Sequence, residues 1–179
     1  MLDEESLVRR AQQKDAEAFA QLYEAYFDKI YRYIRLKLNN EMEAEDMTQQ
    51  VFIKALNSIR SYQYKGVPFS AWLFRIAHND VVDHFRRQSK RATVPIDGLP
   101  IAAYDDPQGM VEQRLEFERV TKAARNLTEA QREVITLRFA AELSIAEVAK
   151  IMGKSEGAIK ALQHSAVLAL RKTLTVSEP

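Results

Sequence analysis

Residues 144–171 read SIAEVAKIMGKSEGAIKALQHSAVLALR, and they carry the most specific local signal of the fold. A capping box that opens at Ser144 predicts a short helix extending to Met152. Gly153 then ends that helix, and Ser155 caps a second, longer one. Two helices around a tight glycine turn are typical of a helix-turn-helix, although an ordinary helical hairpin would give the same pattern.

The second of these helices has two distinct faces. At 100° per residue, apolar side chains including Ile159, Leu162 and Ala166 fall on one side. The opposite face mixes the basic and amide side chains that a helix entering the DNA major groove would present. This candidate face comprises Lys160, His164 and Arg171, with Glu156 and Gln163 along one flank.

The rest of the 179-residue chain also predicts helices, among them one that ends near Asn126 and one that a capping box at Thr128 opens and that extends to about Phe139. Glycine and proline together number only 10, and no long stretch alternates with period two. Three of the five prolines fall in residues 94–108, which predict a linker. The expected fold is all-α, with two small helical domains joined by a flexible linker, the C-terminal one a helix-turn-helix. The expected domains are residues 1–92 and 113–179, with the linker at 93–112.

Charge is distributed unevenly along the chain. The net charge is only +1, but residues 75–91 and 154–172 each carry a local +3. Between them, residues 97–118 carry a local −5. Two basic stretches divided by an acidic one indicate two separate contacts with a polyanion, unless these are simply solvated helix surfaces.

A helix predicted over residues 69–91 has a face suited to nucleic acid. Arg75, Asn79 and Arg86 fall within about 60° of one another, and guanidinium and amide groups suit phosphates and base edges. The loop before this helix contains Tyr62, Tyr64 and Lys65, which could stack on unpaired bases or merely cover the core. Trp72 lies in the apolar stripe, so we expect it in the core.

The helix predicted over residues 41–59 has a polar side that could meet water or dock on a partner helix. Spacing alone does not decide between these two roles. The residues of this side are Glu43, Asp46, Gln49, Gln50, Ile53 and Asn57.

Several classes of protein are excluded or disfavoured by the sequence. The chain has no cysteine, which excludes disulfides and thiolate metal sites. Its three histidines show no metal-ligand spacing, and no phosphate-binding loop or dinucleotide fingerprint is present. No apolar run is long enough to span a membrane, and the acidic N-terminus is not a secretory signal. We therefore expect a cytoplasmic protein without cofactor, metal or enzymatic activity.

Two sets of motifs resemble bacterial RNA polymerase sigma factors. EAEDMTQQVF at 43–52 and FSAWLFRIAHN at 69–79 resemble the first conserved domain of that family. LTEAQREVI at 127–135, LSIAEVA at 143–149 and SEGAIK at 155–160 resemble its promoter-reading C-terminal domain. Two domains without a middle one are similar to the small extracytoplasmic-function (ECF) group, and the match spans residues 5–173.

This resemblance implies a function for each candidate surface. The 41–59 face would bind core RNA polymerase, and Ser155 to Arg171 would enter duplex DNA at the −35 element. The tyrosine loop and the Arg75, Asn79 and Arg86 face would hold single-stranded DNA at the −10 element. An anti-sigma factor, often membrane-bound in this family, is an expected further partner.

The sequence departs from the family pattern at several positions. Leu162-Gln163 stands where Arg-Leu is common, and Ser165 and Val167 stand where arginines are common, which implies fewer phosphate contacts. Asp80 stands where an apolar residue is usual. The alternatives are a stand-alone helix-turn-helix regulator and a sigma-like decoy that binds polymerase but no promoter. The polymerase-docking pattern of the first half favours the sigma factor.

Overall fold

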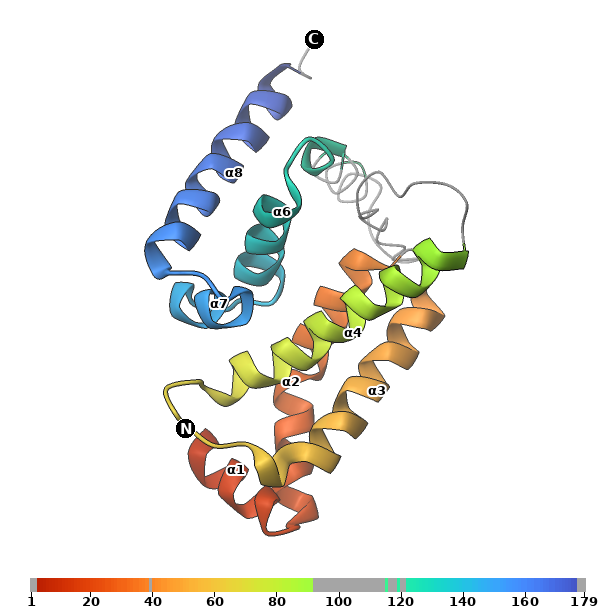
Figure 1. Cartoon of the computed structure of the whole chain (residues 1–179), viewed down its shortest axis with the longest axis vertical. Coiled ribbons are helices and arrows are strands. Elements are labelled where there is room, and N and C mark those ends of the chain that lie inside the picture. The colour runs from red at the N-terminus through yellow and green to blue at the C-terminus, as the bar shows by residue number, and fades with distance from the viewer. Residues whose placement is uncertain (1–2, 39, 92–114, 116–118, 120–121, 177–179) are drawn as a thin grey trace.

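The computed structural model describes residues 3–38, 40–91, 115, 119 and 122–176, and no strand occurs among them (Figure 1). The predicted linker lies outside these residues, as does most of the helix expected before residue 126. The helices run in the order α1 (Glu4–Gln12), α2 (Ala16–Lys37), α3 (Glu41–Ser58), η1 (Ile59–Ser61), α4 (Phe69–Arg91), α6 (Glu129–Ile135), η2 (Thr136–Ala140), α7 (Ile145–Met152) and α8 (Glu156–Val176).

Helices α1 to α4 form the N-terminal half. Asp15 caps α2 by accepting a hydrogen bond from the amide of Ala18, and Asn40 caps α3 in the same way at Glu43. Helices α2, α3 and α4 pack along one another, while α1 crosses the lower end of α2 (Figure 1). Their apolar stripes bury a common core, in which α2 contributes Ile30 with no exposed surface.

The predicted signals of the C-terminal half are confirmed. Thr128 and Ser144 each form a complete capping box at the start of α6 and α7. Gly153 ends α7 in the left-handed conformation at φ +64°, which a glycine adopts without strain. Ser155 caps α8 by accepting from the Ala158 amide. The helix expected from 128 to 139 is divided, because its last turn, η2, is a π-helix.

The two halves pack against each other. Helix α7 lies against α4, and η2 against α2, so that the larger hydrophobic core extends through both halves. A smaller cluster lies around Ala166 of α8. The buried face of α4 is wider than the apolar stripe that the sequence predicts. Phe74 and Ala77 are fully buried, whereas Trp72 is only partly buried. The sequence predicted a single apolar stripe, but α4 has core on two sides.

No helix in the described part of the chain is both long enough and apolar enough to cross a membrane.

Candidate nucleic-acid and polymerase interfaces

The predicted docking face of α3 is open to solvent along its length. Its exposed residues are Glu43, Asp46, Gln49, Gln50, Ile53 and Asn57. Ile53 is 50% exposed, so an apolar side chain lies within this otherwise polar face. An exposed apolar group within a polar rim is a common composition for a protein interface.

A polar groove of about 460 Å³ runs between α3 and α4 beside this face. Asp80 lines it and pairs with Lys54 of α3 at 2.5 Å, leaving 12% of its side chain exposed. This pairing gives the physical reason for an acidic residue where the family usually has an apolar one. The ion pair ties the two helices together at a position facing a groove rather than the core.

The two tyrosines of the loop between η1 and α4 have different environments. Tyr62 is 8% exposed, and its ring packs against Phe69 and Trp72 at centroid distances of 5.8 and 5.2 Å. Its hydroxyl donates to the carbonyl of Val67, and burial, with the nearby Glu4 carboxylate, raises its pKa to about 12. Tyr64 is 69% exposed. Of the two, Tyr64 presents a ring to solvent, whereas Tyr62 serves as a lid over the core.

A groove of about 860 Å³, which the sequence did not predict, lies beside this loop. It opens between the loop and α1, and its lining includes Tyr64, Asp3 and Glu5. A carboxylate of Glu4 accepts a hydrogen bond from the Tyr26 hydroxyl, which fixes α1 against α2. The acidic first turn of α1 was visible in the sequence, but nothing there indicated that it borders the tyrosine loop.

The predicted nucleic-acid face of α4 is exposed, but two of its side chains already have partners within the chain. Asn79 is exposed and lies on the outer side of the helix. Arg86 pairs with Asp83 one turn before it. The guanidinium of Arg75 donates to the carbonyl oxygen of Lys150 at 2.7 Å, and Lys150 lies in the last turn of α7. In this arrangement the C-terminal half occupies part of the α4 face.

The predicted face of α8 points to solvent. Lys160, His164 and Arg171 are exposed, as is Glu156 at the start of the helix. Gln163 is half-buried, and its amide oxygen accepts from Arg138 of η2 at 2.8 Å. The Gln163 amide is therefore held in a fixed orientation.

No group of three or more histidine, aspartate or glutamate side chains capable of holding a metal occurs among the described residues.

Comparison with known proteins places these surfaces in two family domains. Residues 22–91 match the Sigma-70 region 2 model, and residues 123–172 match the Sigma-70 region 4 model. The ECF RNA polymerase sigma factor ShbA of Streptomyces griseus is 34% identical over 177 residues, covering 93% of this chain and 92% of ShbA. The chain belongs to the ECF RNA polymerase sigma factors. The faces of α3 and α4 lie in its region 2, and α8 lies in region 4.

Other relatives of this sigma factor support the assignment. The ECF RNA polymerase sigma factor BldN of Streptomyces coelicolor is 42% identical over 170 residues, covering 94% of this chain. The chain spans 64% of BldN's own length. Among solved structures, CnrH in complex with the cytosolic domain of CnrY superimposes with a TM-score of 0.73 at 25% identity. That match covers 96% of this chain and 97% of CnrH, so it includes both halves.

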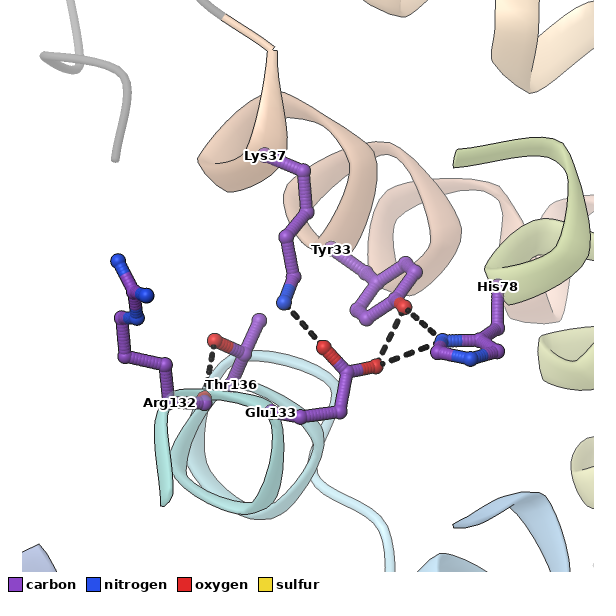
Figure 2. A network of polar contacts seen from close by, with 6 residues as sticks. All are labelled: Tyr33, Lys37, His78, Arg132, Glu133 and Thr136. Carbon is purple, nitrogen blue, oxygen red and sulfur yellow. Dashed lines mark hydrogen bonds and ion pairs between the residues drawn. The ribbon is translucent and has the colours of Figure 1, made fainter. Parts of the chain in front are cut away.

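The interface between region 2 and region 4 contains a buried polar cluster (Figure 2). Glu133 of α6 reaches into region 2, where one carboxylate oxygen accepts from the Tyr33 hydroxyl at 2.6 Å. The same oxygen lies 3.0 Å from Nδ1 of His78, and the other forms an ion pair with Lys37. Both members of that ion pair are less than a tenth exposed.

The cluster holds Glu133 in its charged form. Burial alone would raise the pKa of this carboxyl, but Lys37 and His78 oppose burial and lower it to about 2. Burial and the adjacent Glu133 charge together raise the pKa of Tyr33 well above its ordinary value. Sequence reasoning did not find Glu133, because a single glutamate within an α-helical pattern carries no signal of its distant partners.

Proposed function

We propose that this sigma factor binds core RNA polymerase through α3 and directs it to promoters by contacts to the −10 and −35 elements. The observation that carries the proposal is the presence of three exposed faces, on α3, α4 and α8, within the matched regions 2 and 4. The phosphoryl transfer would belong to the polymerase, and this chain would supply the specificity. Its place of action would be the cytoplasm, where the polymerase meets the chromosome.

Docking on the polymerase is supported by the composition of the α3 face. Carboxylates and amides at Asp46 and Gln50 offer acceptors to a basic or polar helix, and Ile53 offers an apolar contact. The backbone of α3 is already ordered before binding, so only its exposed side chains must be immobilised, which favours a specific contact. The remaining residues of the proposed face are Glu43, Gln49 and Asn57.

Holding of the −10 strand is supported by the loop and by α4. The exposed ring of Tyr64 offers a stacking surface, and Lys65 next to it offers a charge for a phosphate. Asn79 and Arg86 add an amide and a guanidinium on the neighbouring helix. Arg75 belongs to the same proposed face, although region 4 holds it here.

Reading of the −35 element is supported by α8. Its N-terminus begins directly after the Gly153 turn, which is how a helix-turn-helix presents its recognition helix to the major groove. Lys160 and Arg171 are exposed and suited to phosphates or guanine edges. Ser155, Glu156, Gln163 and His164 complete the proposed contact set.

An anti-sigma factor is proposed as a further partner. CnrH, whose fold this chain shares, was solved in complex with the cytosolic domain of CnrY. A membrane-bound anti-sigma factor would hold this chain at the membrane without insertion.

The test is titration of the protein into bacterial core RNA polymerase, followed by transcription from a library of genomic fragments. We expect a stable complex that starts RNA at a small set of sites sharing −35 and −10 motifs. A stable complex without transcripts would point to a decoy. Failure to bind the core, with duplex DNA still bound, would overturn the proposal in favour of a stand-alone regulator.

A further inference from the structure

The contacts between the two halves engage Arg75, a side chain that the proposed function needs for binding DNA. Arg75 of the −10 face donates to the backbone of α7, the first helix of the helix-turn-helix. Ser70, which lies five residues before Arg75 on α4, donates a hydrogen bond to the carboxylate of Glu147 on α7. A −10 strand lying along α4 would therefore compete with α7 for the Arg75 side chain.

In the closed arrangement the chain cannot bind the −35 and −10 elements at the same time, because the two elements lie too far apart. Elements centred at −35 and −10 are about 25 base pairs apart, or about 85 Å of duplex at about 3.4 Å per base pair. A compact chain of this length has a radius of gyration of about 16 Å. With α4 and α7 in direct contact, the two halves must separate before they reach both elements.

The cluster around Glu133 is suited to control that separation. Region 4 contributes a single carboxylate, and region 2 contributes all three groups that bind it. Every one of these contacts is lost when the halves part. Lys37 and Glu133 then regain their hydration, which offsets much of the lost attraction between them. The buried pair therefore favours one closed arrangement without making the separation of the halves prohibitively costly.

We infer that Glu133, held by Lys37, His78 and Tyr33, is an autoinhibitory latch that keeps the unbound sigma factor closed until polymerase and promoter separate its halves. The need for opening rests on the proposed promoter function. The latch itself is a property of the isolated chain, and it can be measured without polymerase or DNA.

The experiment measures the distance between the halves by energy transfer between two dyes. The chain contains no cysteine, so Glu24→Cys on α2 and Lys172→Cys on α8 provide two labelling sites without further changes. Both positions are exposed. We expect a single high-transfer population for the labelled parent. Glu133→Gln removes the charge while keeping the volume, leaves Lys37 buried without its counter-charge, and should shift the equilibrium toward the open form by about a hundredfold.

Two further variants keep the result interpretable. Lys37→Met combined with Glu133→Gln removes both charges, so no unpaired charge is buried in the closed form. This variant should be less open than Glu133→Gln alone but more open than the parent, because it lacks the contacts of the charged carboxylate. Glu142→Gln is the matched control, since Glu142 pairs with Lys29 across the same two halves at 3.9 Å but is 58% exposed. An exposed pair contributes little, so this variant should remain closed.

The outcomes separate the latch from the proposed function. A closed population that is unchanged by Glu133→Gln would overturn the latch, as would a parent chain that is already open. If Glu133→Gln loses helical circular dichroism, the double variant decides: a fully helical double variant that is more open than the parent supports the latch, and one that is as closed as the parent contradicts it. Addition of core polymerase to the parent should lower the transfer. Absence of that effect, with the latch behaviour intact, would instead count against the proposed function.

Discussion

The neighbouring tyrosines of the α4 loop illustrate how much a single residue's environment decides. Tyr62 and Tyr64 have the same side chain two positions apart, yet one is 8% and the other 69% exposed. The buried ring belongs to an aromatic group with Phe69 and Trp72, and its hydroxyl is used by the loop itself. Stability should therefore depend on Tyr62, and nucleic-acid binding on Tyr64.

Alanine substitutions at these two positions test that division. Tyr62→Ala should lower the free energy of unfolding by about 3 kcal/mol, because it opens a cavity in the aromatic group. Tyr64→Ala should leave stability within about 0.5 kcal/mol of the parent and weaken binding of a single-stranded −10 oligonucleotide by the polymerase complex, by about 1–3 kcal/mol for one stacked base. Urea unfolding and fluorescence anisotropy measure the two effects. Equal losses of stability in the two variants would show that Tyr62 and Tyr64 do not have separate roles in stability and binding.

At the scale of the element, helices α3 and α8 each present an exposed face fixed by an apolar opposite side. On α3 the buried residues include Ala44, Val51 and Ala55, which leaves the docking face outward. On α8 the buried side includes Ile159 and Ala166. Since both helices are anchored by packing, substitutions on their outer faces change binding surfaces without removing core contacts.

For α3, we expect Asp46→Ala combined with Gln50→Ala to weaken association with core polymerase by about tenfold or more, as the loss of a central interface contact would. Both residues are exposed, so the helical signal and melting temperature should not change. The matched control is Glu24→Ala with Asp28→Ala, an exposed pair at the same spacing on α2. Equal weakening by both pairs, measured by native gel titration, would remove α3 as the specific docking element.

For α8, Lys160→Ala combined with Arg171→Ala should reduce the salt dependence of promoter binding. If each side chain contacts one phosphate, the slope of log K against log salt concentration should become shallower by about 2. Lys122→Ala with Arg125→Ala removes the same charge from exposed positions outside α8 and serves as the control. An unchanged slope in the α8 variant would show that this face does not lie on DNA.

At the scale of the whole molecule, the packing of region 4 on region 2 depends on an ionised group. Glu133 has a pKa of about 2 in the closed structure, compared with an ordinary value of 4.5. Because the folded-state pKa is depressed, its stabilising effect is complete above pH 4.5 and is lost as the pH falls through 2. The groups that face it are Lys37 and Tyr33 of α2 and His78 of α4.

Acid should therefore destabilise the parent more than a variant that cannot titrate at this site. Between pH 6 and pH 3, the parent should lose about 2 kcal/mol more unfolding free energy than Glu133→Gln. Urea unfolding monitored by circular dichroism at the two pH values measures this difference. Identical losses in the two proteins would mean that Glu133 does not carry a depressed pKa in solution.

The helices and their ends could be predicted from the sequence, because they depend on local chemistry. The capping boxes at Thr128 and Ser144, and the left-handed glycine at 153, were readable from residues at most three apart and are confirmed. The family was also readable, since its motifs are contiguous. The outward faces of α3 and α8 followed from helical periodicity, and their exposure is confirmed except at the half-buried Gln163, whereas their binding roles stay predictions.

Which helix surfaces contact one another depends on tertiary packing and could not be predicted from the sequence. Periodicity shows that a helix has an apolar face but not which partner covers it, so the second buried side of α4 at Phe74 and Ala77 was not predictable. For the same reason, Tyr62 could not be distinguished from Tyr64. Glu133 meets Lys37 across 96 positions of chain, and a charge pair at that separation leaves no local pattern. Its energy arises from burial, which exists only once the two halves have packed.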